Sequence, residues 1–171
     1  MSLITEDYAA LNKQMHAQKK HYGASSGKWA GQVRELYTAM KADSLLDYGC
    51  GKGHLAQQLP FTIKEYDPAI TGKDKTPEPA ALVVCTDVLE HIEPECLEDV
   101  LDDLKRVTRE VLFVTIATRP ANKHLPDGRN AHLIVESASW WLPKLMERFE
   151  LRNFSNVDLE CLAVMEAQHH A

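Results

Sequence analysis

A short apolar segment followed by closely spaced glycines constrains the fold most strongly. Residues 44–53 read Ser-Leu-Leu-Asp-Tyr-Gly-Cys-Gly-Lys-Gly. The apolar side chains near its start favour the end of a buried parallel strand, and residues 54–59 after it have helical spacing. Because glycine has no Cβ, such a turn lets the backbone approach a ligand closely. Strand, glycine turn and helix together predict a cofactor-binding cradle.

The spacing of the glycines distinguishes two kinds of cradle. A nicotinamide-binding turn needs G-x-G-x-x-G, and His54 occupies the position of its third glycine. The chain has G-x-G-x-G instead, with Asp47 two residues before the first glycine. This D-x-G-x-G-x-G pattern resembles motif I of the class I S-adenosylmethionine-dependent methyltransferases. An acid at the strand tip suits a cofactor that carries an ammonium and a sulfonium group, since it places opposite charge nearby.

The composition is that of a soluble globular chain. With 171 residues, 44% hydrophobic and 26% charged, we expect one domain over residues 1–171. Residues 1–30 contain no continuous apolar run of the kind found in signal peptides, and no stretch approaches the roughly 18 apolar residues of a membrane span. The net charge of −6 argues against a broad surface for duplex nucleic acid.

The four cysteines, Cys50, Cys85, Cys96 and Cys161, lie far apart in the sequence. They form neither a CxxC motif nor a zinc-binding spacing. Two histidines near the C-terminal end are too small a set to hold a metal ion. We therefore expect reduced thiols, a cytoplasmic protein and no metal site.

The first 43 residues are expected to form helices that cover the cofactor site, ahead of a core over residues 44–165. Residues 5–20 read as a polar leader helix, and a second amphipathic helix follows. In the methyltransferases that the chain resembles, this segment often folds over the cofactor. Tyr22 and Lys28 therefore either close the site or only anchor a loop.

A second strand is predicted over residues 61–66, and it ends at Asp67 and Pro68. A carboxylate at this strand tip can accept hydrogen bonds from both hydroxyls of an adenosyl ribose. Glu65 is a competitor for this role, but Pro68 ends the strand at Asp67 and so favours Asp67. The alternative is an ordinary turn aspartate before a proline.

The interval before the next strand is unusually short. Only 13 residues, with three prolines and a glycine, separate Asp67 from the strand predicted over residues 81–85. Methyltransferases of this class place two helices and a strand there, and one helix alone takes about 11 residues. We therefore expect that edge strand three is missing. Ile70 and the start of the Asp87 segment remain as candidates for contacts with adenine.

Residues 86–94 follow this strand and read Thr-Asp-Val-Leu-Glu-His-Ile-Glu-Pro. They resemble the segment after the fourth strand of small-molecule methyltransferases, where V-L-E-H is frequent. The N-P-P-Y or D-P-P-Y motif of amino-directed DNA methyltransferases is absent here, and so is the Pro-Cys nucleophile of cytosine-C5 enzymes. The resemblance implies S-adenosylmethionine as the cofactor. The cofactor-binding residues that it implies are Asp47, Tyr48, Gly49, Cys50, Gly51, Gly53, Asp67, Pro68, Thr86, Asp87 and Val88.

The chain then continues with a helix and a strand. Apolar residues at helical spacing predict a helix over residues 97–107. Asp99, Asp102 and Asp103 are expected to form its solvated face. Residues 111–117 are uniformly apolar apart from one threonine and predict the next core strand.

The C-terminal part predicts a helix and a hairpin. An amphipathic helix is expected near residues 140–149, with Pro143 in its first turn. Strands over residues 150–154 and 158–165, joined by residues 155–157, form a closing antiparallel hairpin in the family that the chain resembles. The fold class predicted for the chain is therefore α/β, a Rossmann-like doubly wound sheet that is mostly parallel with an antiparallel C-terminal hairpin.

Cations gather in the loop over residues 118–131, which is long for a compact domain. Arg119, Lys123 and Arg129 stand there with a single acid. They follow a strand whose carboxyl end should face the cofactor crevice. They either bind a phosphate or carboxylate of the acceptor or belong to an ordinary polar loop.

Methyl transfer is an in-line displacement, so the protein mainly aligns the acceptor and excludes water. A base is needed only where the acceptor must lose a proton. The catalytic candidates are His132 and His91, with Asp87 and Glu90 nearby in the sequence. His132 resembles the histidine that often precedes the penultimate helix of small-molecule methyltransferases. It is either a site residue or a structural hydrogen bonder.

Three functions are compatible with these residues. The leading hypothesis is an S-adenosylmethionine-dependent methyltransferase that acts on a small anionic molecule. The second is a methyltransferase for nucleic acid or protein, which the net charge and the absent N-P-P-Y disfavour. The third is a cofactor-binding protein without transfer activity, which is compatible with a trimmed sheet. The sequence leaves the acceptor and the oligomeric state open.

Overall fold

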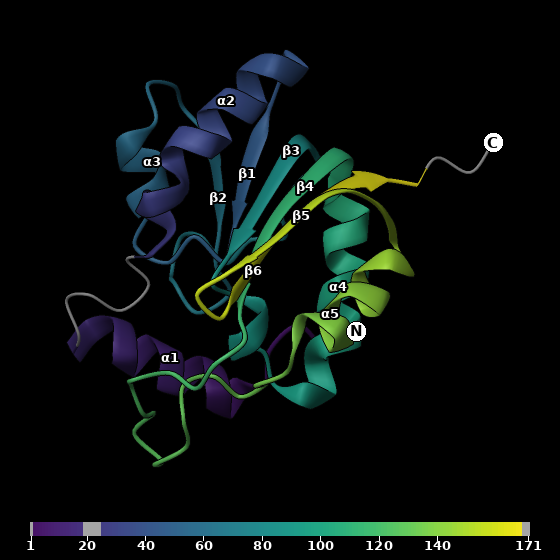
Figure 1. Ribbon diagram of the computed structural model, residues 1–171. Helices are drawn as coiled ribbons and strands as arrows, with labels where there is room; N and C mark the ends of the chain where they lie inside the picture. The colour runs from purple at the N-terminus through teal and green to yellow at the C-terminus, as the bar shows by residue number, and fades with distance from the viewer. Residues whose placement is uncertain (1, 19–24, 169–171) are drawn as a thin grey trace.

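A six-stranded sheet forms the centre of the computed structural model, which describes residues 2–18 and 25–168 (Figure 1). The strands are β1 (Leu45–Tyr48), β2 (Lys64–Tyr66), β3 (Ala80–Thr86), β4 (Thr108–Ala117), β5 (Phe149–Val157) and β6 (Glu160–Ala167). Their order in the sheet is β2-β1-β3-β4-β6-β5. The first four are parallel, whereas β6 is antiparallel to both β4 and β5. The predicted fold class is confirmed.

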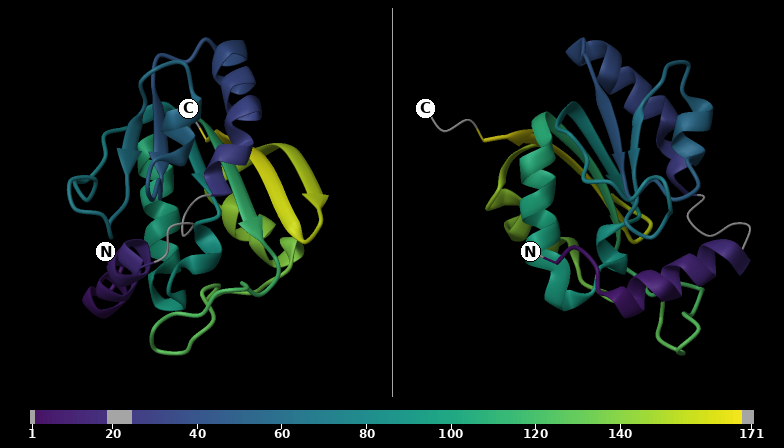
Figure 2. Two further views of the ribbon diagram at one scale, coloured as in Figure 1. Left: turned by 90° about the vertical axis from the view of Figure 1, so that its left-hand side faces the viewer. Right: turned by 180° about the vertical axis from the view of Figure 1, so that it is seen from behind.

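Helices α2 (Ala30–Met40) and α3 (His54–Gln58) cover one face of this sheet, and α4 (Leu97–Val107) and α5 (Ala138–Met146) cover the other (Figure 2). The other described helical elements are α1 (Glu6–Gln18) and the short 3₁₀ segments η1 (Ser25–Trp29), η2 (Leu89–His91) and η3 (Pro94–Cys96). Leu45 and Leu82 pack with α2 and α3, whereas Leu46 and Val83 pack with α4 and α5, because successive strand residues point to opposite faces. Among the residues described, no helix is both long and apolar enough to span a membrane.

Among the described residues, no strand pairs with β2 on its outer side, as predicted. Residues 67–79 form turns and irregular structure between β2 and β3. β2 is shorter than the sequence indicates and begins only at Lys64. Phe61 stacks on Tyr37 of α2, with ring centroids 4.3 Å apart, so the chain packs on this helix before it joins the sheet.

The N-terminal helix α1 lies across the carboxyl ends of the strands, close to the long loop that follows β4 (Figures 1 and 2). Tyr8 and Met15 of α1 are buried and pack with Leu125 and Ala131 of this loop. The Tyr8 hydroxyl also donates a hydrogen bond to the His91 carbonyl oxygen at 2.6 Å. The prediction of a polar leader helix is therefore wrong.

The error arose because most residues of α1 are polar and its apolar stripe is narrow. Tyr8, Leu11 and Met15 form this stripe at helical spacing, and Asn12 lies beside it. Asn12 is buried, and its side-chain amide donates to the Tyr8 carbonyl at 3.2 Å. A polar residue thus belongs to the packed face of the helix.

The C-terminal hairpin turns later than predicted. Its strands pair as far as Val157 and Glu160, so the turn consists of Asp158 and Leu159, with φ of 51° and 60°. Two left-handed residues match the twist of a β-hairpin. The predicted connection over residues 155–157 is therefore wrong, because those residues extend β5.

Pro143 lies in the interior of α5, as its sixth residue, and not in the first turn as predicted. Proline has no N–H, so the carbonyl of Ser139 loses its usual intrahelical partner. Burial of Trp141 and Leu145 against the sheet compensates for this loss. Tertiary packing therefore stabilises a helix that continues through the proline.

Of the acidic residues predicted on a solvated face of α4, Asp102 is exposed as predicted, whereas Asp103 is buried. Asp103 is 2% exposed. It accepts hydrogen bonds from the Tyr48 hydroxyl at 2.9 Å and from Arg106 Nε at 2.7 Å. Asp102 accepts one from Arg148 Nε at 2.6 Å. Sequence spacing placed these acids on one face but could not identify cations from distant elements.

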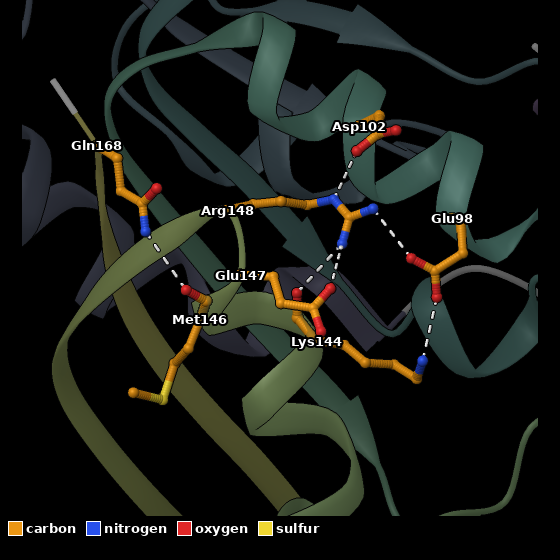
Figure 3. A network of polar contacts seen from close by, with 7 residues as sticks. All are labelled: Glu98, Asp102, Lys144, Met146, Glu147, Arg148 and Gln168. Atoms are coloured by element: carbon orange, nitrogen blue, oxygen red, sulfur yellow. Dashed lines mark hydrogen bonds and ion pairs between the residues drawn. The ribbon is translucent and has the colours of Figure 1, made fainter. Parts of the chain in front are cut away.

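Arg148 links the end of α5 to α4 (Figure 3). Besides its bond to Asp102, it donates to Glu98 Oε2 from Nη2 at 2.9 Å. Lys144 Nζ donates to the other oxygen of Glu98 at 3.0 Å. Arg148 is 9% exposed, so solvent screens its bonds less than those of a surface pair.

Replacing Arg148 should destabilise the fold. Arg148→Ala leaves Asp102 without its cation and Glu98 with Lys144 alone, and we expect the free energy of unfolding to fall by about 1–3 kcal/mol. Arg152→Ala is the control, because that side chain is 54% exposed and pairs at the surface; its effect should stay within about 0.5 kcal/mol. Urea unfolding measures both, and equal losses would contradict the structural role of Arg148.

Candidate active site

A cavity of about 340 Å³ opens at the carboxyl ends of the parallel strands. Residues at the ends of β1 and β2 and after β3 and β4 line it, and α1 contributes from the opposite side. Figure 2 shows α1 and the loop after β4 at this end of the sheet. The carboxyl edge of an open parallel sheet is where such folds bind ligands.

The glycine turn after β1 is held against the end of β2. The backbone N–H groups of Gly49 and Cys50 both donate to the Tyr66 carbonyl, at 2.8 and 3.0 Å. Gly49 has a φ of 77°, and a Cβ there would lie 2.4 Å from Val88 Cγ2. Both the conformation and the space therefore require glycine.

The end of the turn is supported from outside the cavity. Gly53 has a φ of 78°, and a Cβ there would lie 2.3 Å from Glu65 Oε1. Glu65 pairs with Lys73 at 3.0 Å, and Lys73 Nζ donates to the Gly51 carbonyl at 3.2 Å. Glu65 does not line the cavity. Its position shows that it supports the turn.

Asp67 joins the tip of β2 to the turn. Its Oδ2 accepts a hydrogen bond from the Gly51 N–H at 2.9 Å, and its Oδ1 accepts one from the Ala69 N–H at 2.9 Å. Asp67 and Pro68 both line the cavity. Because each carboxylate oxygen can accept a second hydrogen bond, Asp67 retains acceptor capacity toward a ligand.

Asp47 lies beneath this turn and is 1% exposed. Its Oδ2 has no hydrogen-bond partner among the described residues. Burial, reinforced by the charge of Glu65, raises the pKa of Asp47 to about 7. A positive charge at the turn would therefore be favourable.

Two histidines meet on the other side of the cavity. The rings of His91 and His132 contact edge to face, with centroids 4.8 Å apart. Nδ1 of His91 lies 2.7 Å from the Ala131 carbonyl oxygen, and Nδ1 of His132 lies 2.6 Å from the Arg119 carbonyl oxygen. Each neutral ring therefore carries its proton on Nδ1 and its lone pair on Nε2. Burial, followed by the neighbouring His132, lowers the pKa of His91 to about 4.

The loop cations divide into two groups. Arg119 and Lys123 line the cavity. Arg129 does not; it pairs with Asp127 at 2.8 Å, and its guanidinium carbon lies 5.8 Å from the centre of the Tyr8 ring. Arg129 thus holds the loop against α1 from outside.

Residues 17–163 match a family model that describes a methyltransferase domain. The chain belongs to this methyltransferase family. Its assignment to the class I S-adenosylmethionine-dependent methyltransferases, made from the glycine motif, is therefore confirmed. No curated protein sequence matches the chain at a significant level.

Solved methyltransferases share the fold. The 1,6-didemethyltoxoflavin-N1-methyltransferase of Burkholderia thailandensis, crystallised with 1,6-didemethyltoxoflavin and S-adenosylhomocysteine, has a TM-score of 0.66 at 13% identity over 99% of this chain and 93% of that one. The magnesium protoporphyrin IX methyltransferase of Synechocystis PCC 6803, with bound S-adenosylhomocysteine, has a TM-score of 0.59 at 13% identity over 95% of each chain. At these identities the likeness concerns the fold alone.

The methyltransferase cavity brings together most of the predicted site residues. Those that line it are Tyr48, Gly49, Gly51, Asp67, Pro68, Asp87, Val88, His91, Arg119, Lys123 and His132. Those outside its lining are Asp47, Cys50, Gly53, Thr86 and Arg129. Ile70, an adenine candidate, is also outside the lining, but its neighbour Ala69 belongs to it. Tyr22 lies outside the described residues.

Sequence analysis expected the first 43 residues to cover the site, but it did not identify the N-terminal residues that line it. Leu3, Ile4, Tyr8 and Asn12 all line the cavity. Tyr8 and Asn12 are four residues apart and so lie on one helix face. This single spacing is a weak indication of a site in the sequence. Lys28, expected either to close the site or to anchor a loop, lines the cavity and pairs with Glu160 at 2.8 Å.

Asp47 should make the stability of this methyltransferase depend on pH. The pKa of its carboxyl is about 7 in the folded state and about 4 in the unfolded chain. Between these values the folded state binds more protons, so the free energy of unfolding falls as pH rises. Asp47→Asn should remove on the order of 2 kcal/mol of the loss between pH 5 and 8.

Urea unfolding at pH 5 and 8 measures this difference. Some loss should persist in Asp47→Asn, because burial, with the charge of Asp87, also raises the pKa of Glu90, to about 8. Asp74→Asn, at an exposed position in the loop after β2, should keep the wild-type pH dependence. Identical pH dependence in wild type and Asp47→Asn would contradict the prediction.

Proposed function

We propose that this methyltransferase transfers a methyl group from S-adenosylmethionine to a small anionic molecule. The observation that carries the proposal is that one cavity joins the glycine cradle and Asp67 to a basic wall formed by Arg119 and Lys123. The first side suits an adenosyl cofactor, and the second suits an acceptor of negative charge.

The cofactor side fits the adenosyl group. Asp67 lies where the tip of the second strand accepts ribose hydroxyls in this fold class. Pro68 and Ala69 lie next to it in the cavity wall and would contact the adenine. Asp47, with its unpaired buried oxygen, favours a ligand of positive charge at the turn.

The bound cofactor supplies an electrophilic methyl group. In the reaction, a lone pair of the acceptor forms the new bond to carbon while the carbon–sulfur bond breaks and its electron pair returns to sulfur. S-Adenosylhomocysteine is the other product. The chain's own residues align the acceptor and keep water out.

His132 and His91 are proposed to serve the acceptor. Both rings reach the cavity with Nδ1 held by a backbone carbonyl, so Nε2 of each is the atom with a lone pair. Burial lowers the pKa of His91 and so makes its ring a poor proton acceptor. Neither is needed as a base where the acceptor arrives deprotonated.

A small acceptor is favoured over nucleic acid or protein. α1 and the loop after β4 pack together through Tyr8 and Leu125 and narrow the approach to the cavity. The net charge of −6 also disfavours a nucleic-acid surface.

We further propose a cytoplasmic location for the protein, since its four cysteines are free thiols.

Asp67→Ala should weaken binding of S-adenosylhomocysteine by about ten- to a hundredfold, since it removes hydrogen bonds to a charged group. Calorimetry measures the affinity. Asp74→Ala is the matched control, because it removes a carboxylate at an exposed position outside the cavity, and it should bind nearly as tightly as wild type. Unchanged affinity in Asp67→Ala would contradict the assigned ribose contact.

Arg119→Ala should raise the Michaelis constant for the acceptor by about tenfold, because a charge-assisted bond is lost. A panel of carboxylates, phosphates and neutral compounds is incubated with methyl-labelled S-adenosylmethionine, and the compound that takes up label is the acceptor. The Michaelis constant for this acceptor is then measured in wild type and variant. Arg109→Ala, at an exposed position at the other end of β4 and outside the cavity, should leave the constant nearly unchanged. A neutral acceptor with kinetics indifferent to Arg119 would contradict the anionic assignment.

A further inference from the structure

Glu90 is a buried carboxylate with an unexplained oxygen. It follows β3 within η2 and is 0% exposed. One oxygen, Oε1, accepts a hydrogen bond from the Ala117 N–H at 2.9 Å. The other, Oε2, has no hydrogen-bond partner among the described residues. Such an oxygen is costly to bury unless a ligand or ion satisfies it.

Glu90 is grouped with the two histidines of the cavity. Glu90, His91 and His132 each offer one ligand atom, and these atoms all lie within 4.8 Å of one another. Ligand atoms about 2.0–2.2 Å from a shared ion in tetrahedral geometry lie roughly 3.3–3.6 Å apart. Side-chain movements on the order of 1 Å would therefore bring the three atoms around one ion.

Both histidines are oriented as metal ligands usually are. Nδ1 of His91 is bonded to the Ala131 carbonyl, and Nδ1 of His132 to the Arg119 carbonyl. In metal sites the second ring nitrogen commonly donates to a backbone carbonyl, which fixes the tautomer and the ring orientation. The lone pair of each ring is thereby placed on Nε2.

We propose that Glu90, His91 and His132 bind a divalent first-row transition-metal ion beside the methyl acceptor. Two imidazoles and one carboxylate suit such an ion better than Mg²⁺ or Ca²⁺, which prefer oxygen ligands. Three protein ligands also leave coordination positions open. Asp87, which lines the same cavity, adds negative charge nearby.

The role of the ion rests on the proposed function. Its open positions would face the cavity that also holds Arg119 and Lys123. An acceptor hydroxyl or carboxylate could then coordinate the ion, which orients it and lowers the pKa of a hydroxyl proton. His132 would then act through the ion instead of taking the proton itself.

This site departs from the sequence expectation of no metal. The ligands stand at positions 90, 91 and 132, a spacing outside the known short motifs. The loop after β4 carries His132 to the end of β3, where the Ile134 N–H donates to the Glu90 carbonyl at 3.0 Å. Only the fold brings the three together.

The test uses the full chain, stripped with a chelator, and manganese(II) chloride as the probe. Electron paramagnetic resonance of free Mn²⁺, with calorimetry, measures stoichiometry and affinity. We expect one ion per chain, and about a tenfold or greater loss of affinity in His132→Ala. His124→Ala, in the same loop but outside the cluster, should bind like wild type.

Glu90→Gln tests the buried ligand, and circular dichroism identifies a variant that fails to fold. His132 is only half-buried, so His132→Ala should fold. It therefore tests the metal site even if the Glu90 variant does not fold. Absence of Mn²⁺ binding to wild type at millimolar concentration, or equal affinity in His132→Ala and wild type, would overturn the proposal. Binding of S-adenosylhomocysteine to the stripped protein is measured separately, so failure of the metal site is distinguishable from failure of the proposed function.

Discussion

The site depends on the hydrogen bonds that hold the glycine turn of β1 to the end of β2. Gly49 and Cys50 donate to the Tyr66 carbonyl, and Gly51 donates to the Asp67 carboxylate. These bonds shape a backbone that a Cβ would obstruct, and they orient Asp67 at the same time. Because β2 is a three-residue strand at the edge of the described sheet, the turn also secures this edge.

The opposite wall is built by contacts that are distant in sequence. The Tyr8 hydroxyl holds the His91 carbonyl, and the N–H and hydroxyl of Thr5 both donate to Glu93. The loop after β4 then places His132 edge to face with His91. α1, the segment after β3 and this loop therefore behave as one unit, and a change in any of them should alter the acceptor side more than the cradle.

The cofactor side could be predicted from the sequence because its information is local. Strand, glycine spacing and Asp47 lie within ten residues, and the missing strand followed from the length of one interval. The proposed acceptor side could be predicted only in part. Its two histidines, Arg119 and Lys123 were identified and line the cavity, but the wall from α1 depends on tertiary contacts. Asp103 reads as a surface acid until Tyr48 is placed beside it, and the buried face of α1 includes the polar Asn12. Similarly, the spacing of Arg119 and Arg129 cannot tell which one faces the cavity.

A structure of the protein with S-adenosylhomocysteine tests the central claim most directly, that one cavity serves a cofactor on its Asp67 side and an acceptor on its His91–His132 side. The account predicts both ribose hydroxyls within hydrogen-bond distance of Asp67, and the sulfur facing the two histidines and Arg119. A ribose bound away from Asp67, or a sulfur turned from the histidines toward bulk solvent, would contradict it.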